Sequence, residues 1–220
     1  PLLLKMDEDV VSAIDVRENL IDRMEVEISN YLIKLADQEL GDAESHEVTE
    51  LLNFVTECER IGDYAVNIKE KAQELADKEV AFSEMAQQEL KLLDKALEKI
   101  LTLTADAFEA DDGRMASQEP LEQVIDILVE RLRAQHIKRL KDGACSIDTG
   151  VVYLDVLNNV ERISDHCSNI AARLVGMEAG EDYDSHTLKN MMHHNPTKEY
   201  MLNYEQCRKD YLIPLEQLEA

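Results

Sequence analysis

The chain has few of the residues that interrupt helices or build aromatic cores. Its 220 residues include only 7 Gly, 4 Pro and 3 Phe, with no Trp. Because glycine and proline are the strongest helix breakers, their scarcity favours helix over most of the chain. No long stretch alternates apolar and polar residues, as a half-buried strand would. Hydrophobic residues still make up 45% of the chain, which is enough for a buried core, and an all-α fold is predicted.

Signatures of several common functional sites are also missing. The four cysteines form no C-x-x-C pair, which argues against a zinc site or a disulfide framework and favours reduced, intracellular thiols. Cys58 and Cys167 lie in apolar helical contexts and are predicted to be small core residues. No glycine-rich phosphate loop, Ser–His–Asp arrangement or cysteine-nucleophile signature occurs. The apolar opening PLLL is far shorter than the roughly 20 residues that span a bilayer.

Positive charge is scarce as well. The chain has 23 Lys and Arg against 47 Asp and Glu, which gives a formal net charge of −24. Such a surface repels phosphate backbones and anionic membranes, so no nucleic-acid partner is expected. Cations are the natural small partners of this charge, while the alternative is that the acidity only keeps the protein soluble.

The chain is rich in apolar residues spaced three and four apart, as on one face of an amphipathic helix. Turn signals separate these stretches at Gly41, before Ser83, at 111–113, at Gly143 and near Gly180. Six helices are predicted, three in each half, and most are about 25–35 residues long. Pro120 lies near the start of the fourth helix and can kink it. The segment after Gly180 is expected to be helical in pieces.

Two ten-residue segments are nearly the same: ERIGDYAVNI from Glu59 and ERISDHCSNI from Glu161 share six positions. Upstream, ENLID at 18–22 corresponds to EQVID at 122–126. The matched positions lie 102 to 104 residues apart, which indicates a duplicated three-helix unit. We predict two tandem three-helix bundles, with residues 1–112 in the first and residues 113–220 in the second.

Carboxylates recur at matching places in the two halves. The second helix of each half carries a pair at i and i+4, and the first helix adds an acidic stripe; the main candidates are Glu59, Asp63, Glu161, Asp165, Asp22 and Asp126. Gly62 and Ser164 are small, which permits a neighbouring helix to come close. If the stripes face one another, the converging carboxylates must protonate, pair with cations or bind metal. Oxygen ligands suit magnesium, manganese, calcium or ferric iron, and tolerate zinc.

Other interpretations of these residues stay open. Arg60 and Arg162 follow the glutamates directly and could form simple salt bridges with the acids. A di-metal enzyme of the ferritin-like kind would need Glu-x-x-His pairs, and the chain has none. In a plain helical scaffold for partner helices, the acids would only decorate the surface. His166 could join a site, although Tyr64 stands at the matching place in the first half.

The segments ECERIGDYAVNI and NVERISDHCSNI resemble the paired E-x-x-x-D signatures of the PhoU family, regulators of phosphate uptake built from two three-helix bundles. The resemblance covers roughly residues 10–178. The stretches LIDRMEVEISNYLIKLADQEL and HIKRLKDGACSIDTGVVYLDVLNNVERISDH are similar to the PhoU-like cytosolic tail of bacterial sodium/phosphate cotransporter family proteins. Pro1 at the start suggests a fragment of a longer protein.

The resemblance implies a non-enzymatic regulator that binds metal ions, whether iron, zinc, manganese or magnesium. The ligands would be the two E-x-x-x-D pairs, with Asp22 and Asp126 as partners on the first helices. The two sites would not be fully symmetric, because Val129 stands where the first half has Glu25. The implied partner is the membrane domain of a phosphate transporter in the same chain. That places the domain in the cytoplasm, tethered to the inner face of the membrane. Phosphate would bind through the metal, and a homodimer is a further expectation.

Overall fold

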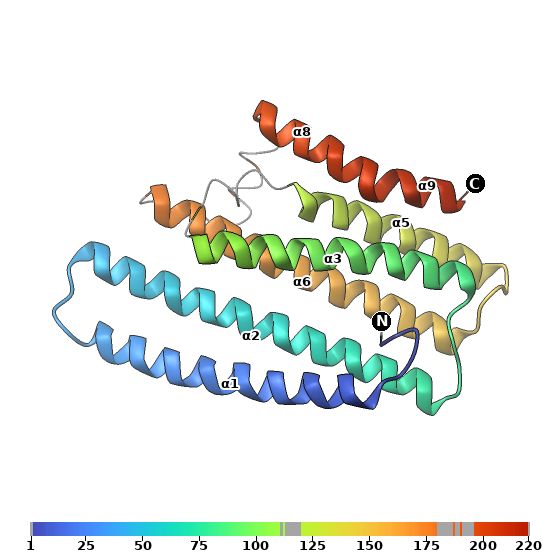
Figure 1. Ribbon diagram of the computed structural model, residues 1–220, viewed down its shortest axis with the longest axis horizontal. Helices are drawn as coiled ribbons and strands as arrows, with labels where there is room; N and C mark the ends of the chain where they lie inside the picture. The colour runs from blue at the N-terminus through green and yellow to red at the C-terminus, as the bar shows by residue number, and fades with distance from the viewer. Residues whose placement is uncertain are drawn as a thin grey trace.

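The computed structural model describes residues 2–110, 112, 120–179, 187, 190 and 196–219. Within these residues the chain is helical and has no strand, which confirms the all-α prediction (Figure 1). The helices are α1 (Glu8–Ala36), α2 (Asp42–Asp77), α3 (Glu84–Ala110), α5 (Leu121–Lys141), α6 (Ile147–Ala179), α8 (Lys198–Cys207) and α9 (Ile213–Glu219). None of the described helices is long and apolar enough to cross a bilayer.

The helix ends follow local signals in the sequence. Asp7 caps α1, since its carboxylate accepts backbone N–H groups of the first turn. The N–H of Gly41 donates to the Glu44 carboxylate at 3.0 Å as α2 begins. Pro120 comes directly before α5, so it starts the helix and does not kink it; a missing N–H costs no helical hydrogen bond there. Gly143, with a φ of 68°, ends α5 in a left-handed conformation.

From Lys198 onward the C-terminal segment is one continuous helical rod. A π-helical turn, η1 (Arg208–Leu212), joins α8 to α9 without a break. Pro214 lies at the start of α9 and has no N–H to donate to the carbonyl of Asp210, four residues earlier. The wider turn of η1 accommodates this missing hydrogen bond, as π-turns and prolines commonly do together in bent helices.

The antiparallel helices α2 and α6, one from each half of the chain, lie at the centre of the fold (Figure 1). Ion pairs join them along their length, with residue numbers rising on one helix as they fall on the other: Glu50–Arg173 at 2.9 Å, Lys71–Asp155 at 2.8 Å and Lys78–Asp148 at 3.5 Å. α1 packs along α2, and α5 packs along α6. The two duplicated segments therefore lie on the two central helices.

The main core lies between α3, α5 and α6, and is closed by α9 and the end of α2. Leu93, Leu128 and Leu157 are among its fully buried side chains. Because α3 packs on α5 and α6, the arrangement is consistent with tandem bundles that share one core. The predicted boundary after residue 112 adjoins residues 113–119, which lie outside the described part, so the division into 1–112 and 113–220 stays a prediction.

The four cysteines are free thiols. Cys167 is buried in the core, and burial raises the pKa of its thiol to about 11. Cys58 is half-buried, and burial, with a smaller contribution from the charge of Glu57, raises its pKa as well. Both thiols are therefore protonated at neutral pH and pack as small side chains, as predicted for these two residues.

Candidate metal centre

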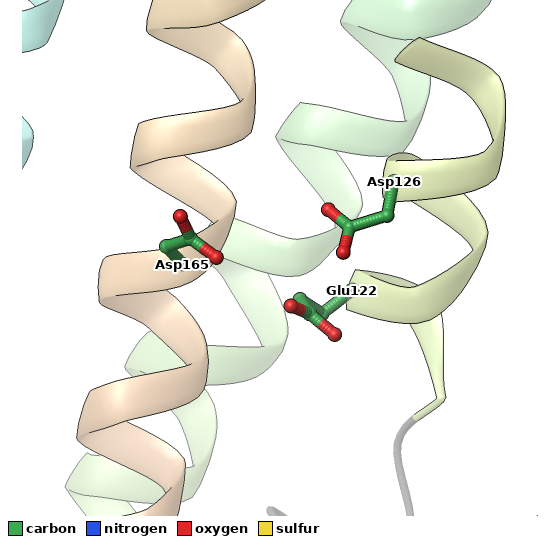
Figure 2. A group of neighbouring side chains, drawn as sticks. All are labelled: Glu122, Asp126 and Asp165. Atoms are coloured by element: carbon green, nitrogen blue, oxygen red, sulfur yellow. The ribbon is translucent and has the colours of Figure 1, made fainter. Parts of the chain in front are cut away.

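Three carboxylates come together between α5 and α6 in the second half of the chain. Glu122 and Asp126 project from α5, and Asp165 faces them from α6 (Figure 2). One oxygen of each lies within 4.8 Å of the others. Glu122 is only 9% exposed, while Asp165 is half-buried and Asp126 is exposed. These residues, which we call the carboxylate triad, bring two of the predicted site residues together.

Helix geometry explains how the triad forms. Residues four apart lie one turn apart on the same face of a helix, so Glu122 and Asp126 point the same way. Three monodentate oxygens at this spacing are a partial ligand set for a hard cation, whose other positions water can fill. The donor chemistry therefore fits the metals that the sequence predicts. The arrangement has no soft donor, so it does not favour copper or a thiolate-bound metal.

Glu161, also predicted to belong to this site, lies outside the triad. Its Oε2 accepts from Nη2 of Arg133 on α5 at 2.8 Å, and Arg133 also donates to Asn158 at 2.9 Å. Glu161, the first residue of the second E-x-x-x-D pair, is thus held in an ion pair with an arginine. Glu122 is the third member of the triad in place of Glu161. It lies in the acidic segment EQVID, four residues before the predicted Asp126, and this i, i+4 spacing was the sequence signal for Glu122.

The first half has a related group on α1 and α2, formed by Glu18, Asp22, Glu59 and Asp63, which we call the first-half acidic patch. The pKa of Glu59 is raised, first by partial burial and then by the charges of Asp63 and Asp22. The pKa of Glu18 is raised by loss of hydration and then by Asp22 and Asp63. All of the causes for Glu59 are burial or other carboxylates, so its neighbours repel it. The predicted residues of this half therefore share one patch.

The two groups differ at a pair of corresponding positions in the two halves. Ser29, whose hydroxyl donates to Glu25 at 3.4 Å, stands at the place that Arg133 occupies 104 residues later. The second half therefore has an arginine to hold Glu161, and the first half has a neutral serine in its place. The two groups are therefore not symmetric, and Ser29 against Arg133 adds to the difference between Glu25 and Val129.

The close approach of neighbouring helices is visible at Gly62. A Cβ atom added there would lie 3.4 Å from Cδ1 of Ile21 on α1. The matching Ser164 of α6 is fully buried. Small residues at these places thus allow the helices that carry the acidic groups to pack closely, as predicted.

The arginines beside the repeated glutamates do not neutralise them. Arg60 and Arg162 are both exposed, and neither makes an ion pair with another described residue. Among the described residues, a salt bridge holds Glu161, and a different arginine, Arg133, supplies it. The first-half acidic patch is left with protons or added cations as its means of relieving repulsion.

A buried polar network beside the triad was not anticipated. Glu57 of α2 is 7% exposed; its Oε2 lies 2.6 Å from Nδ1 of His166 and accepts from Nδ2 of Asn169 at 3.1 Å. His166, considered for the carboxylate site, is instead engaged by Glu57 and stacks on Tyr64. The network fixes α6 on α2 next to Asp165, and the sequence signal for it is only a polar residue within an apolar stripe.

Neutralising the first-half acidic patch should stabilise the metal-free protein. Because the folded-state pKa of Glu59 is raised, its stabilising protonated form is present at low pH and is lost as pH rises through that pKa. We expect Glu59→Gln with Asp63→Asn to raise the free energy of unfolding at pH 7 by about 0.3–1 kcal/mol. Urea unfolding in chelator measures this. Glu161→Gln is the control and should not gain stability, since it breaks the ion pair with Arg133. A lower free energy of unfolding in the double variant would contradict repulsion between the carboxylates of the first-half acidic patch.

Comparison with known proteins supports the fold and the repeat. The sequence model of the PhoU domain family matches residues 2–72 and 83–174 of this chain. A *Thermotoga maritima* protein named phosphate-specific transport system accessory protein PhoU homolog 1 is 28% identical over 133 residues, which are 60% of this chain and 56% of that protein. A *Streptococcus pneumoniae* PhoU homolog is 26% identical over 137 residues, 62% of either chain. The matched part thus spans less than two thirds of these relatives.

Two solved structures share the fold. The crystal structure of PhoU from *Pseudomonas aeruginosa* superposes with a TM-score of 0.74 at 21% identity, covering 81% of this chain and 86% of that one. The phosphate transport system regulatory protein PhoU from *Streptococcus pneumoniae* gives a TM-score of 0.66 at 25% identity, covering 81% and 83%. Since the domain model matches both halves over most of the length, the chain belongs to the PhoU family.

Proposed function

We propose that this chain is a non-enzymatic regulator of phosphate transport that binds metal ions through its two carboxylate groups. Its relatives carry the name of accessory proteins of phosphate-specific transport systems. The metal part depends on one observation, the convergence of Glu122, Asp126 and Asp165 to within 4.8 Å. The first-half acidic patch, where partial burial and then the charges of Asp63 and Asp22 raise the pKa of Glu59, is the proposed second site.

The carboxylates would hold a magnesium, manganese, iron or zinc ion, since oxygen donors accept all four. Binding requires ionised carboxylates, so protons compete with the metal and affinity falls as pH falls. A bound ion supplies positive charge in a chain of net charge −24. That local reversal of sign would let phosphate approach, which the bare acidic surface would repel.

The proposed partner is the membrane domain of a phosphate transporter, in the same chain in the full-length protein. Its PhoU-like part would then lie at the cytoplasmic face and adjust uptake. This proposal draws on the resemblance to cotransporter tails and on the names of the relatives.

A di-metal enzyme is less well supported. The carboxylate triad contains no histidine, and the nearby His166 is engaged by Glu57 at 2.6 Å. Ferritin-like sites use Glu-x-x-His pairs, which supply one nitrogen ligand to each metal. A metal-free scaffold would instead be insensitive to added metal, so the experiment below separates the scaffold from both metal-binding functions.

Thermal unfolding with added Mn²⁺ tests the metal sites. An ion at 100 times its dissociation constant should stabilise the protein by about 2.7 kcal/mol, which raises Tm by roughly 5–10 °C in a chain of this size. In the triple variant Glu122→Gln, Asp126→Asn and Asp165→Asn, we expect the part of this shift due to the triad to disappear. The control has the same charge change at exposed acids elsewhere: Glu70→Gln, Asp77→Asn and Glu98→Gln.

Two outcomes would contradict the proposal. Calorimetry that detects no Mn²⁺ binding to the unaltered protein at millimolar metal would remove the metal function. Cells that produce the triad variant of the full-length protein, in the same amount as the unaltered protein, should differ in phosphate uptake. Equal uptake would remove the regulatory role of the triad. Phosphate binding that needs no metal would overturn only the phosphate part.

A further inference from the structure

The third helix does not close the bundle that α1 and α2 begin. It packs along α5 and α6, while α1 packs along α2. A cleft therefore remains between α3 and the first two helices (Figure 1). Its volume is about 340 Å³, and sites for small molecules commonly have about 300–1,000 Å³. We call it the α3 cleft.

The lining of the α3 cleft is almost entirely apolar. It comes from the N-terminal segment and from α1, α2, α3 and α6. Ile14, Ile61 and Leu97 line it and are half-buried, and Val10 is 43% exposed. Part of the apolar lining thus lies open to water. Concave apolar surface of this kind is typical of a ligand site.

The start of the chain covers one side of the α3 cleft. Leu2, Leu3 and Leu4 line the cleft and are half-buried. They lie in turns ahead of α1, and the segment folds back across α2 (Figure 1). Because these residues belong to no helix, they can shift to admit a ligand without breaking a helical hydrogen bond.

The polar part of the lining consists of three charged residues, Lys69, Lys91 and Asp94. Lys69 is only 9% exposed and is paired with Asp15 of α1, and Asp94 is not free either. Lys91 is exposed and has no ion-pair partner among the described residues. In a chain of net charge −24, a lysine beside an apolar cleft offers its positive charge to an anionic group.

These features select an amphiphile with one apolar chain and one acidic head. An apolar cavity of about 150 Å³ can hold benzene, which has six carbons, so 340 Å³ has room for roughly 10–14 carbons. With the chain in the cleft, the head would lie at the rim, where Lys91 is free to bind it. A saturated fatty acid has this chemistry.

Larger occupants fit the α3 cleft less well. One turn of a partner helix, about 10 Å across, already fills about 400 Å³, which exceeds the volume of the cleft. A membrane surface is also disfavoured, because the lining is concave and the net charge of −24 repels anionic lipid.

We propose that the α3 cleft binds one fatty acid of about 10–14 carbons, with its carboxylate at Lys91. Isothermal titration calorimetry of the 220-residue chain with dodecanoate, below its micelle concentration, should show one molecule bound per chain. Decanoate has two methylenes fewer and should bind about 15-fold more weakly, since each buried methylene contributes about fourfold.

Filling the cleft tests the place of the chain. Ala65 lines the α3 cleft, and a phenyl ring there takes about 150 Å³, so Ala65→Phe should weaken dodecanoate binding at least about tenfold. Val26→Phe is the control, because Val26 is 54% exposed on α1 and does not line the cleft. Leu97→Gln, which makes the lining polar, is a second test should Ala65→Phe lose helix by circular dichroism.

Removing one charge tests the place of the head. Lys91→Gln should weaken dodecanoate binding about threefold to tenfold, as for the loss of a charged partner near the surface. It should leave dodecanol binding unchanged, because that molecule has the same chain and no charge. Lys95→Gln is the control, since Lys95 is exposed on the same helix but lies outside the lining.

Three results would overturn the proposal. The first is no dodecanoate binding by the unaltered chain, and the second is full binding by helical Ala65→Phe or Leu97→Gln. The third is flotation of the chain with phosphatidylcholine vesicles that Ala65→Phe abolishes, in the absence of dodecanoate binding, which would assign the cleft to lipid surfaces. Binding of dodecanoate should persist in chelator, so a failure of the metal sites leaves this proposal standing.

Discussion

Replacing Arg139 with methionine is expected to lower the free energy of unfolding by about 3–5 kcal/mol, the usual cost of leaving one member of a buried ion pair alone. Its partner Glu89 on α3 has 0% of its side chain exposed. The Glu89 oxygens accept from Nη1 and Nη2 of Arg139 on α5 at 2.6 and 2.7 Å. The hydroxyl of Tyr153 on α6 donates to the same carboxylate at 2.6 Å. The pair thus joins three helices inside the core.

Urea unfolding at pH 7 measures this loss. In the double variant Glu89→Met with Arg139→Met both charges are gone, and most of the loss should be recovered, because apolar replacement of a whole buried pair is often neutral. The hydroxyl of Tyr153 then lacks its acceptor, which leaves a cost of about 1–3 kcal/mol. If Arg139→Met alone cost less than about 1 kcal/mol, Glu89 would have to be hydrated or protonated in the folded protein.

Replacing Glu57 with alanine is expected to cost about 2–4 kcal/mol, because buried donors are costly when they lose their acceptor. Glu57 links α2 to α6 through His166 at 2.6 Å and Asn169 at 3.1 Å. His166 is 7% exposed, so its ring gains little hydration when the carboxylate is removed. Because these contacts join the two central helices, the loss should appear as a single, earlier unfolding transition.

Glu70→Ala provides the control on the same helix. Glu70 is exposed, and surface substitutions usually change stability by less than about 0.5 kcal/mol. Equal losses in the two variants would mean that helix propensity or net charge, and not the network around Glu57, sets the effect. Circular dichroism during thermal unfolding distinguishes the two variants.

The helices were predictable because their signals are local. Apolar spacing, the cap at Asp7 and the turns at Gly41 and Gly143 depend on residues within a few positions of each other. The effect of Pro120 was misjudged because a proline can either kink a helix or begin one. Which of the two occurs depends on whether the residues before the proline are helical. The continuity of the helix from Lys198 to Glu219 could not be read from Pro214 alone, because a π-turn accommodates the missing N–H of a proline.

The acidic groups were predictable in position but not in membership. Duplication marked Asp126 and Asp165 as equivalents of first-half acids, and the structure brings them together. The repeat in the sequence could not show that Arg133 binds Glu161 while Glu122 joins the triad, because that choice depends on how α5 is rotated against α6. A rotation of one residue, about 100° on a helix, exchanges one candidate ligand for another.

By itself, the sequence determined an acidic, duplicated, all-helical chain whose carboxylates recur on the first two helices of each half. Those properties follow from residue type and spacing along a single helix. Tertiary structure alone decided that α3 completes a shared core, that Glu161 pairs with an arginine, and that α3 leaves an apolar cleft beside α1 and α2. These outcomes depend on contacts between residues far apart in the chain, whose energies are set by the packing angle and rotation of whole helices.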